Sequence, residues 1–185
     1  MNRPPRVVIT GRPGVGKSTL FRKIVDVLRR NNYSIAGIYA PEVRGDSHRL
    51  GFKIVDLYSG EESWLAHRNY HSSVRVGRYG VLINEASRLW KKALANIQLA
   101  DVVCIDEVGP MELKIPGFKN DLLEKVLSSN KPAILVIHYR LRDPDILKAL
   151  ENALWIEVRL DNRNKLCLEI PYKVLNMVNE YYGRG

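Results

Sequence analysis

A nine-residue run near the N-terminus, "GRPGVGKST" (11–19), places glycines, a lysine and two hydroxyl side chains at a spacing suited to holding phosphate groups. It satisfies the pattern GxxxxGK[ST], in which glycines let the main chain curl so that successive amides converge on phosphate oxygens. In such a loop Lys17 would reach the β- and γ-phosphates of a nucleoside triphosphate, the Ser18 hydroxyl would take one Mg²⁺ position, and Thr19 would help to hold the α-phosphate. The predicted nucleotide-binding residues are Gly11, Arg12, Pro13, Gly14, Val15, Gly16, Lys17, Ser18 and Thr19.

Two adjacent acids, Asp106 and Glu107, follow the apolar run "VVCI" (102–105). A phosphate-binding loop needs a second Mg²⁺-directed carboxylate at the end of a neighbouring strand, and Asp106 fits this role by acting through a metal-bound water. Glu107 points elsewhere on an extended chain, where it could polarise the water that attacks the γ-phosphate; a surface acid beyond the strand is the alternative. The stretch "DEVG" also matches DxxG, which predicts an approach of the Gly109 amide to the γ-phosphate.

Strand and helix patterns alternate along the chain and would position these residues. The run "RVVIT" (6–10) predicts a buried strand directly before the loop, and the stripe Leu20, Ile24 and Leu28 predicts a helix directly after it. Strands buried on both faces and alternating with helices predict a mainly parallel sheet, with ligands at the carboxyl ends of its strands. Further strands are predicted at 34–41, 101–106, 132–138 and 154–160, and further helices at 81–99, 117–129, 143–152 and 171–182.

Signals for helix ends accompany the last two helices. Asp143 is placed to cap the helix of 143–152, with Pro144 at its first helical position. Pro171 is typical of a helix start, and Gly183 is typical of the residue that follows a helix. We therefore expect the terminal helix to begin at Pro171.

Residues 42–60 depart from the alternation of strands and helices. The turn residues Gly45, Asp46 and Ser47 precede the alternating run "GFKIVDLY" (51–58), which closes on "SG" (59–60). Alternation between turn signals is typical of paired antiparallel strands. The sequence therefore predicts an antiparallel hairpin attached to the main sheet.

The composition is that of an ordinary globular domain with a basic surface. The 185 residues, 45% of them hydrophobic, predict one domain that spans 1–185. No run approaches membrane-spanning length, and two cysteines without CxxC spacing predict neither a disulfide framework nor a zinc site, which favours the cytoplasm. The net charge of +9 comes from scattered basic residues, which favours a solvated surface. A nucleic-acid partner stays open without a supporting motif, and the sequence carries no signal for oligomeric state.

Six segments carry a more specific pattern than the loop alone: "GRPGVGKSTL", "GIYAPEVR", "RLGFKIVDL", "RVGRYGV", "IDEVGPMEL" and "DNRNKL". In this order, from about residue 6 to the end of the chain, they resemble the THEP1-type nucleoside-triphosphatases. The resemblance implies an α/β, three-layer P-loop NTPase sandwich with a mainly parallel sheet. Its RecA-like order would place another strand between the strand of 6–10 and the one that ends at Asp106. The resemblance also implies Mg²⁺-dependent hydrolysis of several nucleoside triphosphates, ATP and GTP among them, to the diphosphate and phosphate, with tolerance of the base.

The resemblance extends to charged and polar residues outside the loop. After the strand that ends at His138, related enzymes present a polar or basic group toward the γ-phosphate, so Arg140 or Arg142 would stabilise transition-state charge. A solvated arginine explains either residue equally well. Asn162 and Arg163 correspond to the place where the family could pack the base, and a loop that enters a helix is the alternative.

Glu42 and Arg44, in "PEVR", resemble the entrance to the family's hairpin and would face the phosphate side. An internal ion pair explains them as well.

Three functions remain open on the sequence alone. The preferred one is an NTP phosphohydrolase in which Lys17 and Glu107 are catalytic, and Ser18 and Asp106 hold Mg²⁺, the latter through water. The second is a P-loop kinase that transfers the phosphoryl group to a nucleotide or another small acceptor. The third is a nucleotide-dependent switch that binds RNA or protein.

Overall fold

One continuous sheet of ten strands runs through the computed structural model, which describes residues 3–46 and 48–184. Its parallel part follows the order β10–β1–β9–β8–β2. Because β9 lies between β1 and β8, the expected RecA-like order is confirmed. The bounds of these strands are Arg6–Thr10 for β1, Ile35–Tyr39 for β2, Val102–Val108 for β8, Ala133–Ile137 for β9 and Leu154–Glu157 for β10.

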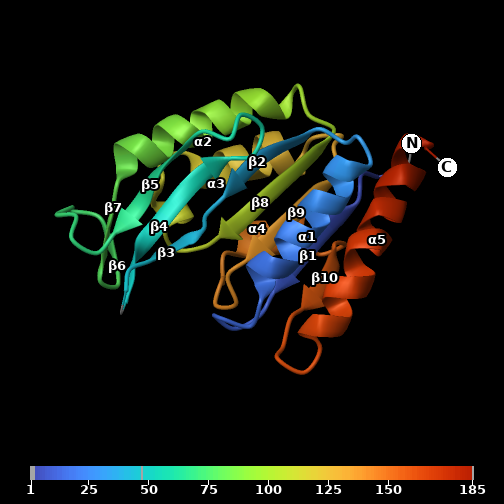
Figure 1. Cartoon of the computed structure of the whole chain (residues 1–185). Helices are drawn as coiled ribbons and strands as arrows, with labels where there is room; N and C mark the ends of the chain where they lie inside the picture. Colours follow the sequence, from blue (N-terminus) through green and yellow to red (C-terminus); the bar gives the residue numbers. More distant parts are fainter. Residues whose placement is uncertain (1–2, 47, 185) are drawn as a thin grey trace.

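Beyond β2 the sheet continues as an antiparallel extension made of β3 to β7 (Figure 1). The strand β4 pairs with β2, β3 and β5, and β7 and β6 follow at the edge. The predicted hairpin is therefore confirmed as β3 and β4, although Ser47 of its predicted turn lies outside the described residues. The strands β5 to β7 have no clear sequence pattern. The bounds are Glu42–Arg44 for β3, Arg49–Asp56 for β4, Glu62–His67 for β5, Arg75–Val76 for β6 and Tyr79–Val81 for β7.

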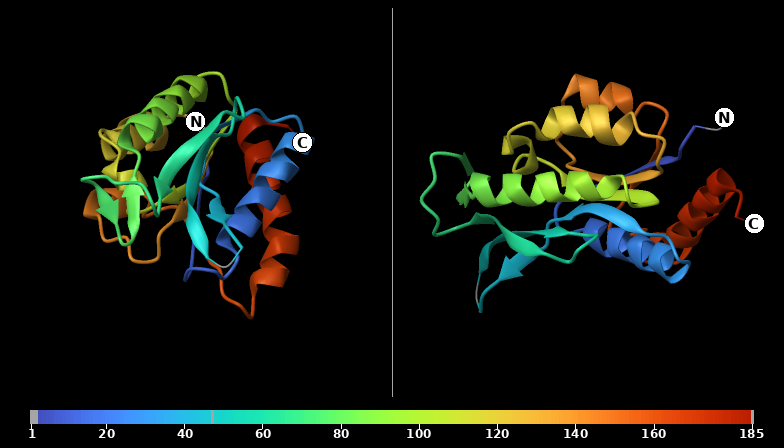
Figure 2. Two further views of the ribbon diagram at one scale, coloured as in Figure 1. Left: turned by 60° about the vertical axis from the view of Figure 1, so that its left-hand side comes forward. Right: turned by 90° about the horizontal axis from the view of Figure 1, so that it is seen from above.

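Helices cover both faces of the parallel strands, as the view from above in Figure 2 shows. On one face lie α1 (Lys17–Arg30) and α5 (Arg163–Tyr182), which pack against each other. On the other face lie α2 (Ile83–Ile97), α3 (Phe118–Asp121) with the π-helical turn Leu122–Leu127 that continues it, and α4 (Pro144–Ala149). The predicted three-layer α/β sandwich is thus confirmed.

A separate hydrophobic core fills the space under each helical layer. On the α1 side, Leu20, Phe21 and Ile24 are fully buried against the sheet. On the α2 side, Trp90 packs against Phe118 with their ring centroids 4.5 Å apart. These helix faces are apolar at i, i+3 and i+4 spacing, so burying them holds both layers on the sheet and fixes the ends of its strands.

The helix ends agree with the sequence at two points and differ at one. Asp143 caps α4 by accepting hydrogen bonds from the amides of Asp145 and Ile146, and Gly183 follows α5 in the left-handed conformation, as predicted. The predicted start of the terminal helix at Pro171 is wrong, because α5 already begins at Arg163. Pro171 lies buried inside α5 on the face that packs on the α1-side core, and this packing outweighs the loss of one main-chain hydrogen bond.

Within residues 3–46 and 48–184, no helix combines the length and the apolar character required to cross a membrane.

Gly37 offers a test of how closely β2 and β8 must approach to align the end of the sheet. Its φ is +118°, and a Cβ at this position would lie 2.0 Å from the carbonyl oxygen of Cys104 on β8. We expect Gly37→Ala to lower the free energy of unfolding by about 3 kcal/mol, measured by urea denaturation. Gly60→Ala is the control, since Gly60 has a φ of +76° but no heavy atom within 4 Å of the added carbon. It should lose only about 1 kcal/mol; equal losses would contradict the packing account.

Candidate functional site

The loop of residues 11–16 joins β1 to α1 and has a main-chain path that requires glycine. Gly11, Gly14 and Gly16 have φ values of +145°, +79° and +111°, which residues with a Cβ atom rarely adopt. At Gly11 an added Cβ would also lie 2.4 Å from the carbonyl oxygen of Val158, which follows β10. The loop therefore curls tightly against the end of the sheet, ahead of the N-terminus of α1.

Lys17 is the first residue of α1, and its side chain folds back over this loop. The Nζ atom donates hydrogen bonds to the carbonyl oxygens of Gly11 (3.0 Å) and Arg12 (3.2 Å). Lys17 is only 9% exposed, so its charge acts in a partly dehydrated space, where it interacts more strongly with an anion than it would in water. The geometry thus brings a buried ammonium group and the positive end of a helix to one place.

Asp106 lies at the carboxyl end of β8, level with Tyr39 on β2 and Val136 on β9. Its carboxylate accepts a hydrogen bond from the Ser18 hydroxyl, and its Oδ2 atom is buried without a hydrogen-bond partner among the described residues. Burial raises the pKa of this carboxyl to about 7, while Ser18 and the positive charge of Lys17 oppose the rise. A buried, half-satisfied carboxylate next to a serine hydroxyl is an arrangement of hard oxygen donors that suits Mg²⁺.

Glu107 follows on the same strand, which continues to Val108 instead of ending at Asp106. The register of β8 against β9 shifts between Asp106 and Val108, so Glu107 is an extra residue in the ladder. Such a bulge re-aims a side chain, and here both acids line one cleft, whereas neighbours on a regular strand face opposite sides. Burial raises the pKa of the Glu107 carboxyl, and the nearby charge of Lys17 opposes that rise.

This cleft has a volume of about 290 Å³ and lies between the loop and the antiparallel extension. Its walls come from five parts of the chain: the loop with the start of α1, the link between β2 and β3, the extension, the segment from the end of β8 to the following turn, and the residue after β9. The lining residues are Pro13, Gly14, Lys17, Ser18, Ala40, Glu42, Arg49, Phe52, Val76, Asp106, Glu107, Pro110, Met111, Glu112 and His138.

Glu112 also lines the cleft, although no motif in the sequence predicts it. It is 4% exposed and begins the short 3₁₀ turn Glu112–Lys114. Burial raises the pKa of its carboxyl to about 8, and the negative charge of Glu107 adds to the rise. The Gly109 amide donates a hydrogen bond to this carboxylate, so the Gly109 amide already has a partner within the protein. An acid between the apolar residues Met111 and Leu113 was the available signal, because glutamate is rarely buried without a function or a partner.

His138, at the end of β9, is a second lining residue that was not assigned a role. Its Nδ1 atom accepts a hydrogen bond from the Arg140 amide at 3.2 Å. Burial lowers the pKa of the imidazole, and the nearby positive charges of Lys17 and Arg140 lower it further. A neutral imidazole therefore faces the same space as the two acids of β8.

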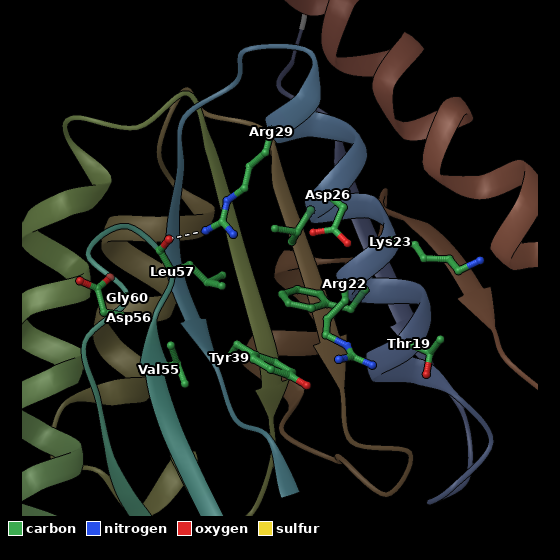
Figure 3. A pocket seen from close by; sticks show the side chains of 12 residues that line it. Thr19, Arg22, Lys23, Asp26, Arg29, Tyr39, Val55, Asp56, Leu57 and Gly60 are labelled. Atoms are coloured by element: carbon green, nitrogen blue, oxygen red, sulfur yellow. Dashed lines mark hydrogen bonds between the residues drawn. The ribbon is translucent and has the colours of Figure 1, made fainter.

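A larger groove of about 580 Å³ runs beside α1 (Figure 3). Arg22 and Asp26 of α1 and Tyr39 of β2 point into it, and the Arg29 guanidinium bonds the carbonyl oxygen of Leu57 across it. Of the predicted loop residues only Thr19 lines this groove, whereas Lys17 and Ser18 line the smaller cleft. The groove lacks the acids of β8, so volume alone does not mark the place for phosphate chemistry.

Comparisons with known proteins agree with this geometry. The pattern of the family described as NTPase matches residues 6–171. The chain is 43% identical to "Nucleoside-triphosphatase THEP1" of Saccharolobus solfataricus over 173 residues, which are 94% of this chain and 92% of that relative. This chain belongs to the THEP1 family of nucleoside-triphosphatases. The THEP1 of Hyperthermus butylicus is also 43% identical, over 97% of this chain and 94% of its own length.

Two solved structures of related proteins have the same fold. The crystal structure of THEP1 from Aquifex aeolicus superposes with a TM-score of 0.75 at 29% identity, and it covers 89% of this chain and 96% of its own. The solution structure of a human cancer-related nucleoside triphosphatase gives the same TM-score and identity over 93% of this chain and 98% of its own. As a THEP1-family member, the chain is an enzyme that hydrolyses nucleoside triphosphates.

The two arginines that the THEP1 resemblance suggested after β9 lie outside the cleft lining. The guanidinium of Arg140 lies 5.0 Å from the ring centroid of Tyr139, in a cation–π arrangement. Arg142 donates from Nη1 to the carbonyl oxygen of Leu141 at 2.9 Å. Both arginines are exposed, and the contacts just described are with residues of their own loop.

Asn162 and Arg163, at the start of α5, behave differently from each other. The Asn162 amide closes the turn between β10 and α5, because its Oδ1 accepts from the Arg159 amide and its Nδ2 donates to the carbonyl oxygen of Glu157. Arg163 approaches the loop: a Cβ added to Gly16 would lie 3.8 Å from its Cδ atom. The structure thus brings Arg163, and not the Asn162 side chain, beside the loop.

Glu42 and Arg44 form the ion pair that was the alternative interpretation of "PEVR". Glu42 also pairs with Arg49 and lines the cleft together with it. The Arg44 side chain is 75% exposed and does not line the cleft.

Gly109 provides a test of whether the placement of Glu107 matters. A Cβ at Gly109 would lie 2.7 Å from Glu107 Oε1 and 3.2 Å from Glu112 Oε2. Since both atoms end flexible side chains, Gly109→Ala should keep the fold but displace the Glu107 carboxylate. We expect phosphate release to fall by roughly 100-fold, the scale of losing a positioned proton acceptor, with nucleotide affinity nearly unchanged. Unaltered phosphate release from a folded variant would show that this position of Glu107 is unimportant.

Glu112 should make the stability of the nucleotide-free protein depend on pH. Its folded-state pKa of about 8 exceeds the ordinary value of 4.5, so the folded state binds the proton more tightly and loses stability as pH rises between these values. We expect Glu112→Gln to be more stable than wild type at pH 9, by on the order of a few kcal/mol, and to lose this advantage near pH 4. Urea denaturation at both pH values measures it. If the difference in free energy of unfolding between Glu112→Gln and wild type does not change with pH, the raised pKa of Glu112 is contradicted.

Proposed function

We propose that the chain catalyses Mg²⁺-dependent hydrolysis of nucleoside 5′-triphosphates to the diphosphate and phosphate, with broad tolerance of the base. The observation that carries this proposal is the meeting of Glu107 with Lys17, Ser18 and Asp106 in one cleft. Any P-loop enzyme that binds phosphates and a metal ion needs residues such as Lys17, Ser18 and Asp106, whereas a second acid at this place serves the activation of water.

Asp106 and Ser18 are the residues that would hold the metal ion. The unpartnered, buried Oδ2 of Asp106 and its hydrogen bond from Ser18 support this role, because a metal-bound water or the ion itself would satisfy that oxygen. Bound there, Mg²⁺ would offset the negative charge of the phosphates. The charge of such an ion would also favour the ionised form of Asp106, whose pKa is raised by burial.

Lys17, Glu107 and the loop amides would carry the hydrolytic step. Lys17 exchanges its bonds to the carbonyl oxygens of Gly11 and Arg12 for bonds to phosphate oxygens, while the main-chain N–H groups of residues 11–19, except that of Pro13, which has none, surround the triphosphate. Glu107 orients a water toward the γ-phosphorus and accepts its proton as the new P–O bond forms and the bond to the β-phosphate oxygen breaks. The diphosphate is the leaving group, and Lys17 stabilises the charge that develops on it.

Broad base tolerance follows from the proposed surroundings of the base. The Asn162 amide is already used within its turn, which supports a positioning role there and not base reading. Arg163 is exposed beside Gly16, where a guanidinium plane can stack on any nucleobase. A site of this kind discriminates little between ATP, GTP and other nucleoside triphosphates.

Phosphoryl transfer to a small acceptor is the second candidate, and one feature of the cleft favours it. The wall beyond the acids includes the apolar side chains Phe52, Val76 and Met111, which neither phosphate nor water requires. Phosphate release without an added acceptor separates the two reactions. If no free phosphate forms, and a phosphorylated product appears only after nucleosides or nucleotides are added, the result would favour the kinase.

The cellular setting and organisation are part of the same proposal. We place the enzyme in the cytoplasm as a single domain spanning 1–185. Both cysteines are unpaired, and burial raises the pKa of the Cys104 thiol, which keeps it unreactive inside β8.

Two substitutions separate catalysis from binding. Glu107→Gln should retain nucleotide affinity but lose phosphate release by roughly 100- to 10,000-fold, since the amide cannot accept the proton. Lys17→Ala should weaken both, because the lysine contacts the phosphates before and during the reaction. Phosphate release with Mg²⁺, and binding of a non-hydrolysable analogue, provide the two readouts. Full turnover by Glu107→Gln would remove Glu107 from the mechanism.

A further inference from the structure

The cleft presents an uneven distribution of charge toward a γ-phosphate. Among the described lining residues, four are acids (Glu42, Asp106, Glu107 and Glu112), and the lysine and arginine side chains are those of Lys17 and Arg49. A phosphoryl group in transfer spreads negative charge over three oxygens, and P-loop enzymes commonly stabilise it with an arginine in addition to the loop lysine. Arg49 is therefore the arginine in position to act on this charge.

Arg49 is the first residue of β4, and its guanidinium is held by three neighbours. It pairs with Glu42 on β3, bonds the Tyr79 hydroxyl, and lies 5.4 Å from the ring centroid of Phe52. Phe52 in turn packs edge-on against Tyr79, with centroids 5.4 Å apart. These contacts restrict the side chain at the cleft wall before any ligand arrives, which lowers the entropy lost when it binds an anion.

The pairing of β3 with β4 makes the bond between Arg49 and Glu42 exchangeable. Arg44 and Arg49 lie directly opposite each other, an arrangement of like charges that destabilises a strand pair. Glu42 offsets both charges, because it pairs with each arginine. If Arg49 leaves Glu42 for a phosphate oxygen, Arg44 keeps Glu42 neutralised and the two arginines no longer share one partner.

We propose that Arg49 donates hydrogen bonds to the γ-phosphate oxygens and stabilises the transition state, as an arginine supplied within the same chain by the antiparallel extension. The inference rests on the proposed hydrolysis. Arg49 forms and breaks no covalent bond: the attacking water, the proton accepted by Glu107 and the departing diphosphate balance the step. The role assigns a function to the extension, whose β3 and β4 form the wall of the cleft opposite the loop.

Arg49→Ala tests the proposal, with Arg44→Ala as the matched control. Both substitutions remove an arginine that pairs with Glu42. The Arg44 side chain is 75% exposed and lies outside the cleft lining, whereas the Arg49 side chain is 40% exposed and lines the cleft. We expect kcat to fall roughly 10³-fold in Arg49→Ala with KM within a few-fold of wild type, and kcat to fall by no more than a few-fold in Arg44→Ala, which loses only the exposed partner of Glu42. Binding of the diphosphate with aluminium fluoride, which mimics the transferring group, should weaken by a similar factor in Arg49→Ala alone.

Further outcomes separate this role from a structural one and from failure of the hydrolysis itself. Added guanidinium should partly restore kcat to Arg49→Ala, which a merely misfolded enzyme would not show. Arg49→Lys keeps the charge next to Glu42 but loses the planar fork, so it should lose at least roughly tenfold in kcat and serves if the alanine variant does not fold. Wild-type kcat in both Arg49 variants, or a change in KM alone, overturns the role of Arg49 while hydrolysis stands. Absence of phosphate release from wild type overturns both proposals.

Discussion

The hydrogen bond from the Ser18 hydroxyl to the buried Asp106 carboxylate joins the beginning of α1 to the end of β8. These two segments come together only because β9 lies between β1 and β8 and fixes the register of both. The same register sets the bulge that turns Glu107 toward the cleft, and the pairing of β8 with β2 aligns Asp106 with Tyr39 at the edge where the antiparallel extension begins. The geometry of the site therefore depends on strand order more than on any single loop.

The cleft gathers charges that the folded chain alone tolerates poorly. Burial raises the pKa values of Asp106, Glu107 and Glu112, which means that ionising them costs free energy in the nucleotide-free protein. The two hydrophobic cores on opposite faces of the sheet stabilise the strand ends that hold these acids. A bound metal ion would give these acids a partner of opposite charge, so their ionisation would cost less free energy when the ion binds together with the substrate.

The loop of residues 11–19 and the acids of β8 were predictable because each depends on a short, local pattern beside a strand. The parallel sheet followed from alternating strands and helices for the same reason. Glu112, His138 and Arg49 were missed, since they reach the cleft from separate elements and no spacing in the sequence links them. Pro171 misled the prediction of α5 because a local helix-start signal was overridden by packing on α1. The strands β6 and β7 are too short to show alternation, and β5, "ESWLAH", does not alternate regularly between polar and apolar residues.

The central claim is that water, and not another acceptor, attacks the γ-phosphorus. A single turnover of ATP with Mg²⁺ in ¹⁸O-labelled water tests it most directly, with the released phosphate and ADP analysed by mass spectrometry. The account predicts one labelled oxygen in the phosphate and none in the ADP, because the water oxygen forms the new bond and the β–γ bridging oxygen leaves with the diphosphate. Label in the ADP, or phosphate released without label, would contradict it.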